Sequence, residues 1–97
     1  MKLADLNPAW IGLGNFPPPN LKMGVRFDCP CCRSHKLVAH FRQPIDPQSL
    51  LANTSWQPPA LSWDRTGEDF ESLTLLPSID YSQSGHWHGH IINGEIQ

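Results

Sequence analysis

The chain has 97 residues, which suits one domain and is too short for two independent hydrophobic cores. Its net charge of −2 excludes a strongly basic nucleic-acid-binding protein. Ten prolines and seven glycines exceed the average combined share of about 12% and predict a fold rich in loops. No apolar run approaches the roughly 18 residues of a membrane span, and no secretory signal is recognisable. We therefore expect a cytoplasmic protein that contacts no membrane.

The first part of the chain predicts an irregular, proline-rich arm. We expect a single domain in which residues 1–20 lie against a zinc-binding β core of residues 21–97. Three consecutive prolines, Pro17–Pro19, favour an extended stretch without internal hydrogen bonds. The large side chains of Trp10 and Phe16 favour an arm packed on the core, and a proline-rich recognition segment is the alternative.

Two segments with alternating apolar residues flank the only cysteines of the chain. Residues 21–28 and 35–42 each alternate, and the apolar positions are Met23, Val25, Phe27, Leu37, Ala39 and Phe41. A period of two residues is typical of half-buried strands. The sequence therefore predicts a hairpin like that of a zinc ribbon, with Cys29-Pro30-Cys31-Cys32 at its turn.

The middle of the chain predicts connections and short extended segments. Residues 43–60 contain four prolines and are expected to be mainly loop, with one turn of helix at residues 47–52. We expect a short strand at residues 61–64 and a turn at residues 66–69. An extended segment should then run from residue 70 and end at Leu76-Pro77.

The last segment predicts a strand and a hairpin. Residues 86–92 are expected to be extended, and Asn93-Gly94 is the strongest two-residue signal for a hairpin turn. Residues 95–97 would begin the returning strand. Because no segment predicts a long helix, we expect a mainly β fold, a small zinc-stabilised domain with a ribbon-like hairpin and short strands.

The spacing of the cysteines favours a metal site. Cys29 and Cys32 have the Cys-x-x-Cys spacing that lets two thiolates bind one tetrahedral cation, whereas a disulfide here would close almost no loop. A redox dithiol normally begins a helix, which nothing here predicts. In a strand, His86, His88 and His90 would share one face. We therefore predict a structural zinc site formed by Cys29, Cys32, His86 and His88.

The other candidate ligands are left open. Cys31 is either a third cysteine ligand in place of one histidine or a free thiol beside the metal. We expect His35 and His40 on the hairpin surface or in hydrogen bonds around the site, and His90 to be only packed or hydrogen-bonded. Four ligands that include cysteine are typical of a structural site, and no His-Glu-x-x-His motif or phosphate-binding loop occurs. We therefore expect no enzymatic activity.

Charge is unevenly distributed along the chain. Residues 1–45 carry a net charge of +4 and residues 46–97 a net charge of −6. The two halves attract each other within one fold, or a basic face around the hairpin meets an acidic partner. For phosphate binding a charge of +4 is modest. Four tryptophans either fill the core or anchor an interface, and these are Trp10, Trp56, Trp63 and Trp87.

Three short motifs together suggest a family. In chain order they are Phe27-Asp28-Cys29-Pro30-Cys31-Cys32, Leu73-Thr74-Leu75-Leu76-Pro77-Ser78-Ile79 and His88-Gly89-His90-Ile91-Ile92-Asn93-Gly94-Glu95-Ile96. Together they resemble a family of small phage and prophage proteins without assigned function, whose members are often mislabelled "ammonia monooxygenase". The resemblance covers residues 25–97. Oxygenase chemistry would require copper or iron with open coordination positions, so we discount that label.

The resemblance implies a cytoplasmic, zinc-bound β fold of phage or prophage origin. It places ligands at Cys29, Cys32 and His88, and because this chain lacks the family's cysteine near His88, His86 is the expected substitute. We expect a non-enzymatic module that binds a host or phage protein and modulates a host or defence complex. A nucleic-acid-binding protein similar to zinc ribbons and a virion-associated structural protein are the alternatives, and the oligomeric state is open.

Overall fold

The computed structural model describes residues 1–14, 18, 20–45, 51 and 55–97. Two antiparallel sheets dominate it, so the mainly β fold is confirmed. The first sheet has the order β1-β2-β3 and the second the order β4-β5-β6-β7. Short 3-10 turns accompany the strands, among them η1 (Leu3–Leu6) and η3 (Ser82–Ser84). The strands of the described residues are β1 (Ala9–Ile11), β2 (Lys22–Asp28), β3 (Lys36–Ile45), β4 (Asp64–Thr66), β5 (Thr74–Asp80), β6 (His88–Ile92) and β7 (Glu95–Ile96).

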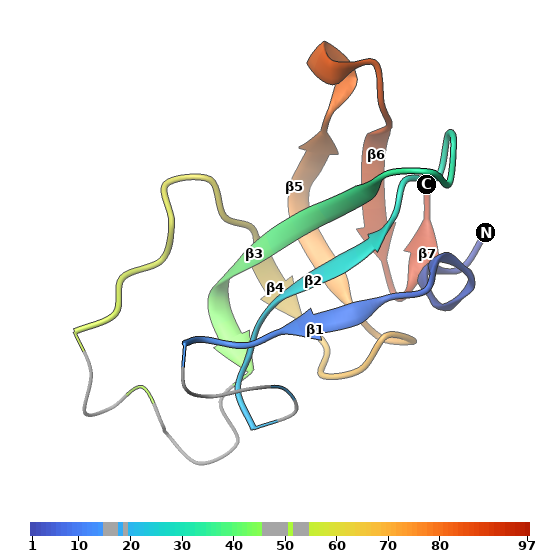
Figure 1. Cartoon of the computed structure of the whole chain (residues 1–97). Helices are drawn as coiled ribbons and strands as arrows, with labels where there is room; N and C mark the ends of the chain where they lie inside the picture. Colours follow the sequence, from blue (N-terminus) through green and yellow to red (C-terminus); the bar gives the residue numbers. More distant parts are fainter. Residues whose placement is uncertain (15–17, 19, 46–50, 52–54) are drawn as a thin grey trace.

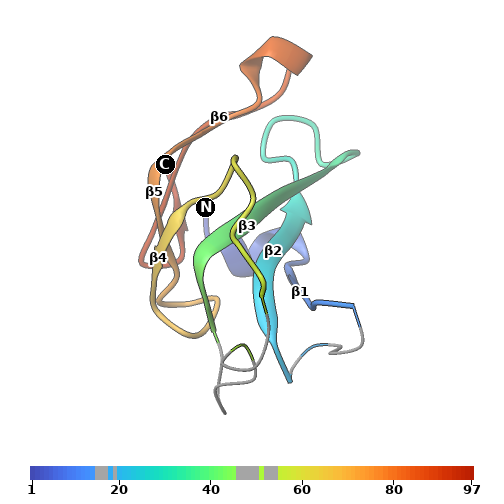
Figure 2. The same cartoon turned by 90° about the vertical axis from the view of Figure 1, so that its left-hand side faces the viewer.

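The two sheets form two layers around one core. In Figure 1 the first sheet crosses in front of the second, and Figure 2 shows the layers from the side. The expected hairpin is confirmed, because β2 and β3 pair around the cysteine segment. β3 alternates in burial from Lys36 to Phe41, whereas β2 is mostly buried and exposes only Arg26. Met23 of β2 is buried but is not one of the residues that form the apolar core between the sheets. The buried core residues are Leu3, Leu6, Val25, Phe27, Cys29, Leu37, Ala39, Phe41, Ile45, Trp63, Leu73, Leu75, Ile79 and Ile91.

The N-terminal segment is more regular than expected. Leu3 and Leu6, on the 3-10 turn η1, are fully buried, and β1 pairs with β2. Trp10 in β1 stacks on Phe70, with the ring centroids 4.3 Å apart. The segment is therefore part of the core, because burial of these side chains fixes it. Most of the triple-proline stretch lies outside the described residues.

The second sheet departs from the expected strand limits. The strand expected at residues 61–64 appears as β4, later in the chain. β5 continues through Pro77 to Asp80, because its pairing with β6 shifts between Leu75 and Ile79, and proline is tolerated at such an irregularity. The helical turn expected at residues 47–52 lies almost wholly outside the described residues.

The hairpin predicted at Asn93-Gly94 is confirmed. Both residues have positive φ, 49° and 73°, as a type I′ turn requires, and Ile92 of β6 pairs with Glu95 of β7. Gly94 also accepts a hydrogen bond from the backbone N–H of Leu3 at 2.8 Å. The last hairpin is thus tied to the N-terminal turn.

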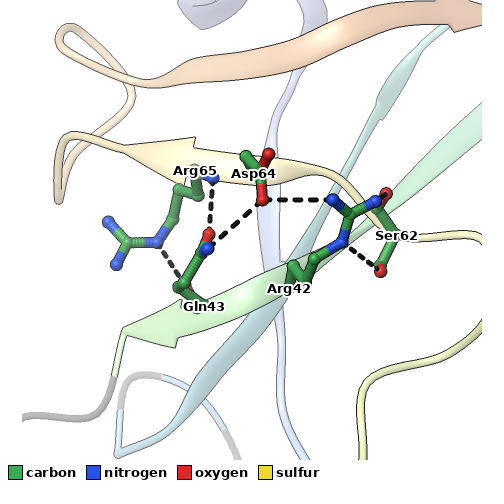
Figure 3. A network of polar contacts seen from close by, with 5 residues as sticks. All are labelled: Arg42, Gln43, Ser62, Asp64 and Arg65. Atoms are coloured by element: carbon green, nitrogen blue, oxygen red, sulfur yellow. Dashed lines mark hydrogen bonds and ion pairs between the residues drawn. The ribbon is translucent and has the colours of Figure 1, made fainter.

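A polar network joins the two sheets along β3 and β4 (Figure 3). The guanidinium of Arg42 donates to the carbonyl oxygen of Ser62 at 2.7 Å and pairs with Asp64 at 3.2 Å. Gln43 donates to the same Asp64 carboxylate, and Arg65 Nε donates to the carbonyl oxygen of Gln43 at 2.7 Å. These contacts hold β4 against β3 and close one side of the core.

The described residues include no helix of the length and apolarity that a membrane span requires.

Asp28 is a buried carboxylate at the end of β2, immediately before the cysteine segment. Lys36 pairs with it, and Asn7 Nδ2 donates to its Oδ2 atom at 3.0 Å. These hydrogen bonds, that of Lys36 first, lower the pKa of the Asp28 carboxyl below its ordinary value of 3.8. The ionised carboxylate therefore stabilises the fold above that ordinary value, and this contribution is lost as pH falls through the lowered pKa.

We expect Asp28→Asn to lower the melting temperature by several degrees at pH 7, because the ion pair with Lys36 is lost. The deficit should begin to shrink below about pH 4, where the carboxyl group of the unfolded chain takes up its proton, and should disappear once pH falls below the lowered pKa of the folded protein. Melting followed by circular dichroism between pH 7 and pH 3 checks this. Glu68→Gln, at an exposed position, is the control and should match the parent chain. An equal deficit at every pH would contradict the ionic contribution.

Candidate metal centre

A tight loop between β2 and β3 gathers the cysteines. The backbone N–H of Cys29 donates to the carbonyl oxygen of His35 at 2.8 Å, and that of Arg33 donates to the carbonyl oxygen of Cys29 at 2.7 Å. Arg33 adopts the left-handed conformation, with a φ of 57°, and this reverses the chain toward β3. The cysteine thiols are held together by these backbone bonds.

His86 reaches the cysteine loop from the other sheet. It follows η3 and Gly85, which has a φ of 76°, and its backbone N–H donates to the carbonyl oxygen of Tyr81 at 3.0 Å. The Tyr81 hydroxyl donates to the carbonyl oxygen of Val38 in β3 at 2.6 Å. Trp87 packs edge-on against Phe27, with the ring centroids 6.1 Å apart. Contacts on both sides of His86 thus fix its loop to the hairpin.

Four potential ligand atoms converge between these two loops. The sulfur atoms of Cys29, Cys31 and Cys32 and a ring nitrogen of His86 all lie within 4.8 Å of one another. Nδ1 of His86 is 3.6, 3.9 and 3.7 Å from the three sulfur atoms, in that order. Cys29 is buried, His86 is half-buried and the other two cysteines are exposed. The cluster therefore opens to solvent on one side.

The distances fit a tetrahedral site. With metal–sulfur bonds of about 2.3 Å and a metal–nitrogen bond of about 2.05 Å, tetrahedral angles place nitrogen about 3.6 Å from each sulfur. The three distances from His86 Nδ1 agree with that value within 0.3 Å. The sulfur atoms of Cys29 and Cys31 are 3.1 Å apart, closer than the about 3.8 Å of a tetrahedral site, so these two would separate slightly. Three thiols and one imidazole can together hold a single metal ion.

Hydrogen bonds around the cluster separate the two exposed thiols in acidity. Those from Ser34 and then from His35 lower the pKa of the Cys32 thiol to about 5. The pKa of the Cys31 thiol is raised to about 11, first by its hydrogen bond with Cys29 and second by partial loss of contact with water. Because metal ions bind thiolates, Cys32 is ready to bind at neutral pH, whereas binding by Cys31 requires the release of its proton.

The cluster contains Cys29, Cys32 and His86 from the predicted set, with Cys31 as the fourth member. The remaining expected ligand, His88, lies elsewhere, because its Nε2 atom contacts Ser78 Oγ at 3.2 Å and the residue pairs with Asp80. The expectation assumed one continuous strand from residue 86. β6 begins only at His88, so the alternation of strand faces does not extend to His86.

The other histidines take the surrounding positions. His35 is not part of the four-residue cluster, yet its Nδ1 atom lies 3.5 Å from the sulfur of Cys32 and its ring lies 4.4 Å from that of His86. This agrees with the expectation of a hydrogen bond around the site. His90 exchanges backbone hydrogen bonds with Gln97, and His40 lines a pocket on another part of the surface. Neither belongs to the cluster.

The comparisons with known proteins supply no relative. No protein-family model matches the chain. No curated protein and no solved structure is significantly similar to it. The chemistry of the site is therefore argued from the residues alone.

The two nearby histidines provide a matched test of the cluster. We expect His86→Ala to lower metal affinity by more than the 10–100-fold that loss of a residue around the ligands typically costs, because a ligand itself is removed. His88→Ala, two residues away, should retain the affinity of the parent chain. Competition with a chromophoric chelator measures both. The opposite order of effects would place the metal at His88.

Proposed function

We propose that Cys29, Cys31, Cys32 and His86 hold a structural zinc ion and that the protein is a non-enzymatic, protein-binding module. The observation that carries the proposal is the near-tetrahedral approach of His86 to three cysteine sulfurs. Thiolate with imidazole in tetrahedral geometry is the donor set typical of zinc. Four protein ligands leave no open position for a substrate, so the ion stabilises the fold.

The position of the cluster supports a structural role. His86 and Cys29 are separated by 57 positions in the chain and belong to loops of different sheets. A metal bound to both would cross-link the two layers at one end of the core. Because such a site forms only in the folded chain, the free energy of metal binding would contribute directly to the free energy of folding.

Exposed apolar side chains support a role in protein binding. Among the described residues, the large apolar side chains that are exposed are Met1, Leu61 and Leu76, and Leu61 is 67% exposed. Leu61 borders a groove in which apolar surface predominates, lined by Arg42, Ala60, Leu61, Ser62, Trp63, Pro77, Ser78, Asp80 and Tyr81. Such a groove suits an apolar side chain of a protein partner. We propose Leu61 and Leu76 as the centre of that contact.

Of the two roles that the sequence left open for the tryptophans, filling the core and anchoring an interface, burial favours the first. Trp63 is buried in the core, and Trp10 and Trp87 are partly buried and pack against it. Trp56 is half-buried and lines a second pocket, beside His40 and Met23. The proposed contact therefore depends on leucine side chains.

We propose a bacteriophage or prophage origin on the three motifs alone, with a host or phage protein in the bacterial cytoplasm as the partner and modulation of a host or defence complex as the task. Nucleic-acid binding is less well supported. Lys36 is paired with Asp28 and Arg42 with Asp64, so two basic side chains of the hairpin are already neutralised. A virion-associated role would require the same partner surface in an assembled particle.

Metal content and stability test the zinc proposal. We expect one zinc per chain by elemental mass spectrometry on protein purified without a metal-binding tag. A ligand at 1,000 times its Kd stabilises a protein by about 4 kcal/mol, so chelation should lower the melting temperature by at least about 15 °C. Restoring zinc should reverse the loss. Protein that contains no metal and melts unchanged with chelator would overturn the proposal.

Partner capture tests the binding surface. We expect the protein to retain a stoichiometric partner from a bacterial lysate after nuclease treatment, and Leu61→Ser with Leu76→Ser to reduce its recovery at least about tenfold, because the apolar contact is lost. Gln83→Ser, at an exposed position of η3, is the control and should retain the partner. Loss of the partner with nuclease would favour nucleic-acid binding.

A further inference from the structure

We propose that the metal centre is also a redox-sensitive modification site, in which a hydroperoxide joins Cys29 and Cys31 in a disulfide and releases the metal. The inference rests on the proposed zinc site and assigns it a second property. It follows from two observations, the exposure of two of the three thiols and the contact between Cys29 and Cys31.

Exposure gives an oxidant access to the site. Cys31 and Cys32 are exposed, whereas Cys29 is fully buried. Zinc-bound sulfur remains nucleophilic, and a small peroxide can reach an exposed sulfur directly. The first oxidised sulfur should therefore belong to an exposed cysteine. The buried Cys29 would act second, as the thiolate that resolves the product.

Geometry selects the pair that closes. The sulfur atoms of Cys29 and Cys31 are 3.1 Å apart in the structure and would be about 3.8 Å apart around a bound ion, so a shift of about 1–2 Å brings them to the 2.05 Å of a disulfide bond. Cys31 and Cys32 are adjacent, and their Cα atoms, about 3.8 Å apart, are closer than the 4.4–6.8 Å that disulfides usually span. The Cys32 sulfur contacts His35 Nδ1 at 3.5 Å, and this contact favours Cys31 over Cys32 as the partner of Cys29.

The chemistry balances with one hydroperoxide. The Cys31 sulfur, which the bound ion would hold as a thiolate, would attack the O–O bond and become a sulfenic acid, while the departing oxygen takes up one proton and leaves as water, or as an alcohol from an organic peroxide. The Cys29 thiolate then attacks the sulfenic sulfur, and the hydroxyl leaves as water after taking up a second proton. Sulfur loses two electrons in total, and the peroxide gains them. Only Cys32 and His86 then remain as ligands, so the metal dissociates.

Loss of the metal would act on one part of the molecule. The two sheets share an apolar core that contains Phe27, Leu75 and Ile79, and Cys29 is the one residue of the cluster that belongs to it. The loop that carries His86 would keep the Tyr81 hydrogen bond, the Trp87–Phe27 contact and the contact between the His86 and His35 rings. Oxidation would therefore loosen this loop while the sheets stay folded.

The wild-type chain is suited to the test, so no variant has to fold. Zinc-loaded protein is treated with increasing hydrogen peroxide, and released zinc is followed with a chromophoric chelator. The remaining thiols are then blocked with N-ethylmaleimide. Trypsin cleaves after Arg26 and Arg33, so one peptide carries all three cysteines. Mass spectrometry identifies the labelled residue, because Cys32 lies outside a ring closed between Cys29 and Cys31. Dithiothreitol and zinc then test reversal.

We expect one zinc released per disulfide formed, the maleimide label on Cys32 alone, and full recovery of zinc binding after reduction. Far-ultraviolet circular dichroism should remain that of the folded sheets. Zinc release with the label on Cys31 or Cys29, or release only after irreversible oxidation to sulfinic acid, would overturn the redox proposal and leave the zinc site standing. Absence of zinc from the untreated protein would overturn both.

Discussion

Three sulfur atoms and one imidazole nitrogen meet at the end of this molecule, and they come from loops that belong to different sheets. Their approach requires that the β2–β3 hairpin and the β5–β6 hairpin be fixed relative to each other. The core supplies that constraint through Phe27 and Trp87, and the Tyr81 hydroxyl adds a hydrogen bond to Val38. A bound cation would in turn hold these loops together, so packing and coordination support each other.

The proposed metal binding and the proposed protein binding depend on different parts of the molecule. Four ligands at the cluster favour a structural ion, and the exposure of two of those ligands makes the same ion vulnerable to oxidation. The exposed leucines lie on the segments around Trp63 and Pro77. The segment that carries Leu61 is held by the network between β3 and β4, which does not involve the cysteine loop, and Leu76 in β5 pairs with Asp64 of that network (Figure 3). Tyr81 lines the groove and also accepts a hydrogen bond from the backbone N–H of His86, so loss of the metal would affect one edge of the proposed partner surface.

Much of the fold follows from local patterns. Alternation around the cysteines predicts β2 and β3, and Asn93-Gly94 predicts the last turn, because each depends on nearby residues and on the side-chain period of a strand. The sequence predicts the limits of β4 and β5 less well than those of β2 and β3. Pro77 indicated the end of a strand, yet the shifted pairing between β5 and β6 allows the strand to continue. The N-terminal turn depends on burial of Leu3 and Leu6 in the core and β1 on its pairing with β2, and no local pattern reveals either.

The sequence by itself determined the chemistry of the site: three cysteines in one short loop and a group of histidines near the end of the chain, with the residue types that bind a borderline-soft metal. Only the tertiary structure decided which histidine joins them. β6 begins after His86, so that residue lies in a loop above the hairpin and His88 points to Ser78. The position of a strand end depends on pairing with another strand, and spacing along the chain cannot show it. The same holds for Cys31, whose sulfur enters the cluster because the backbone turns at Arg33.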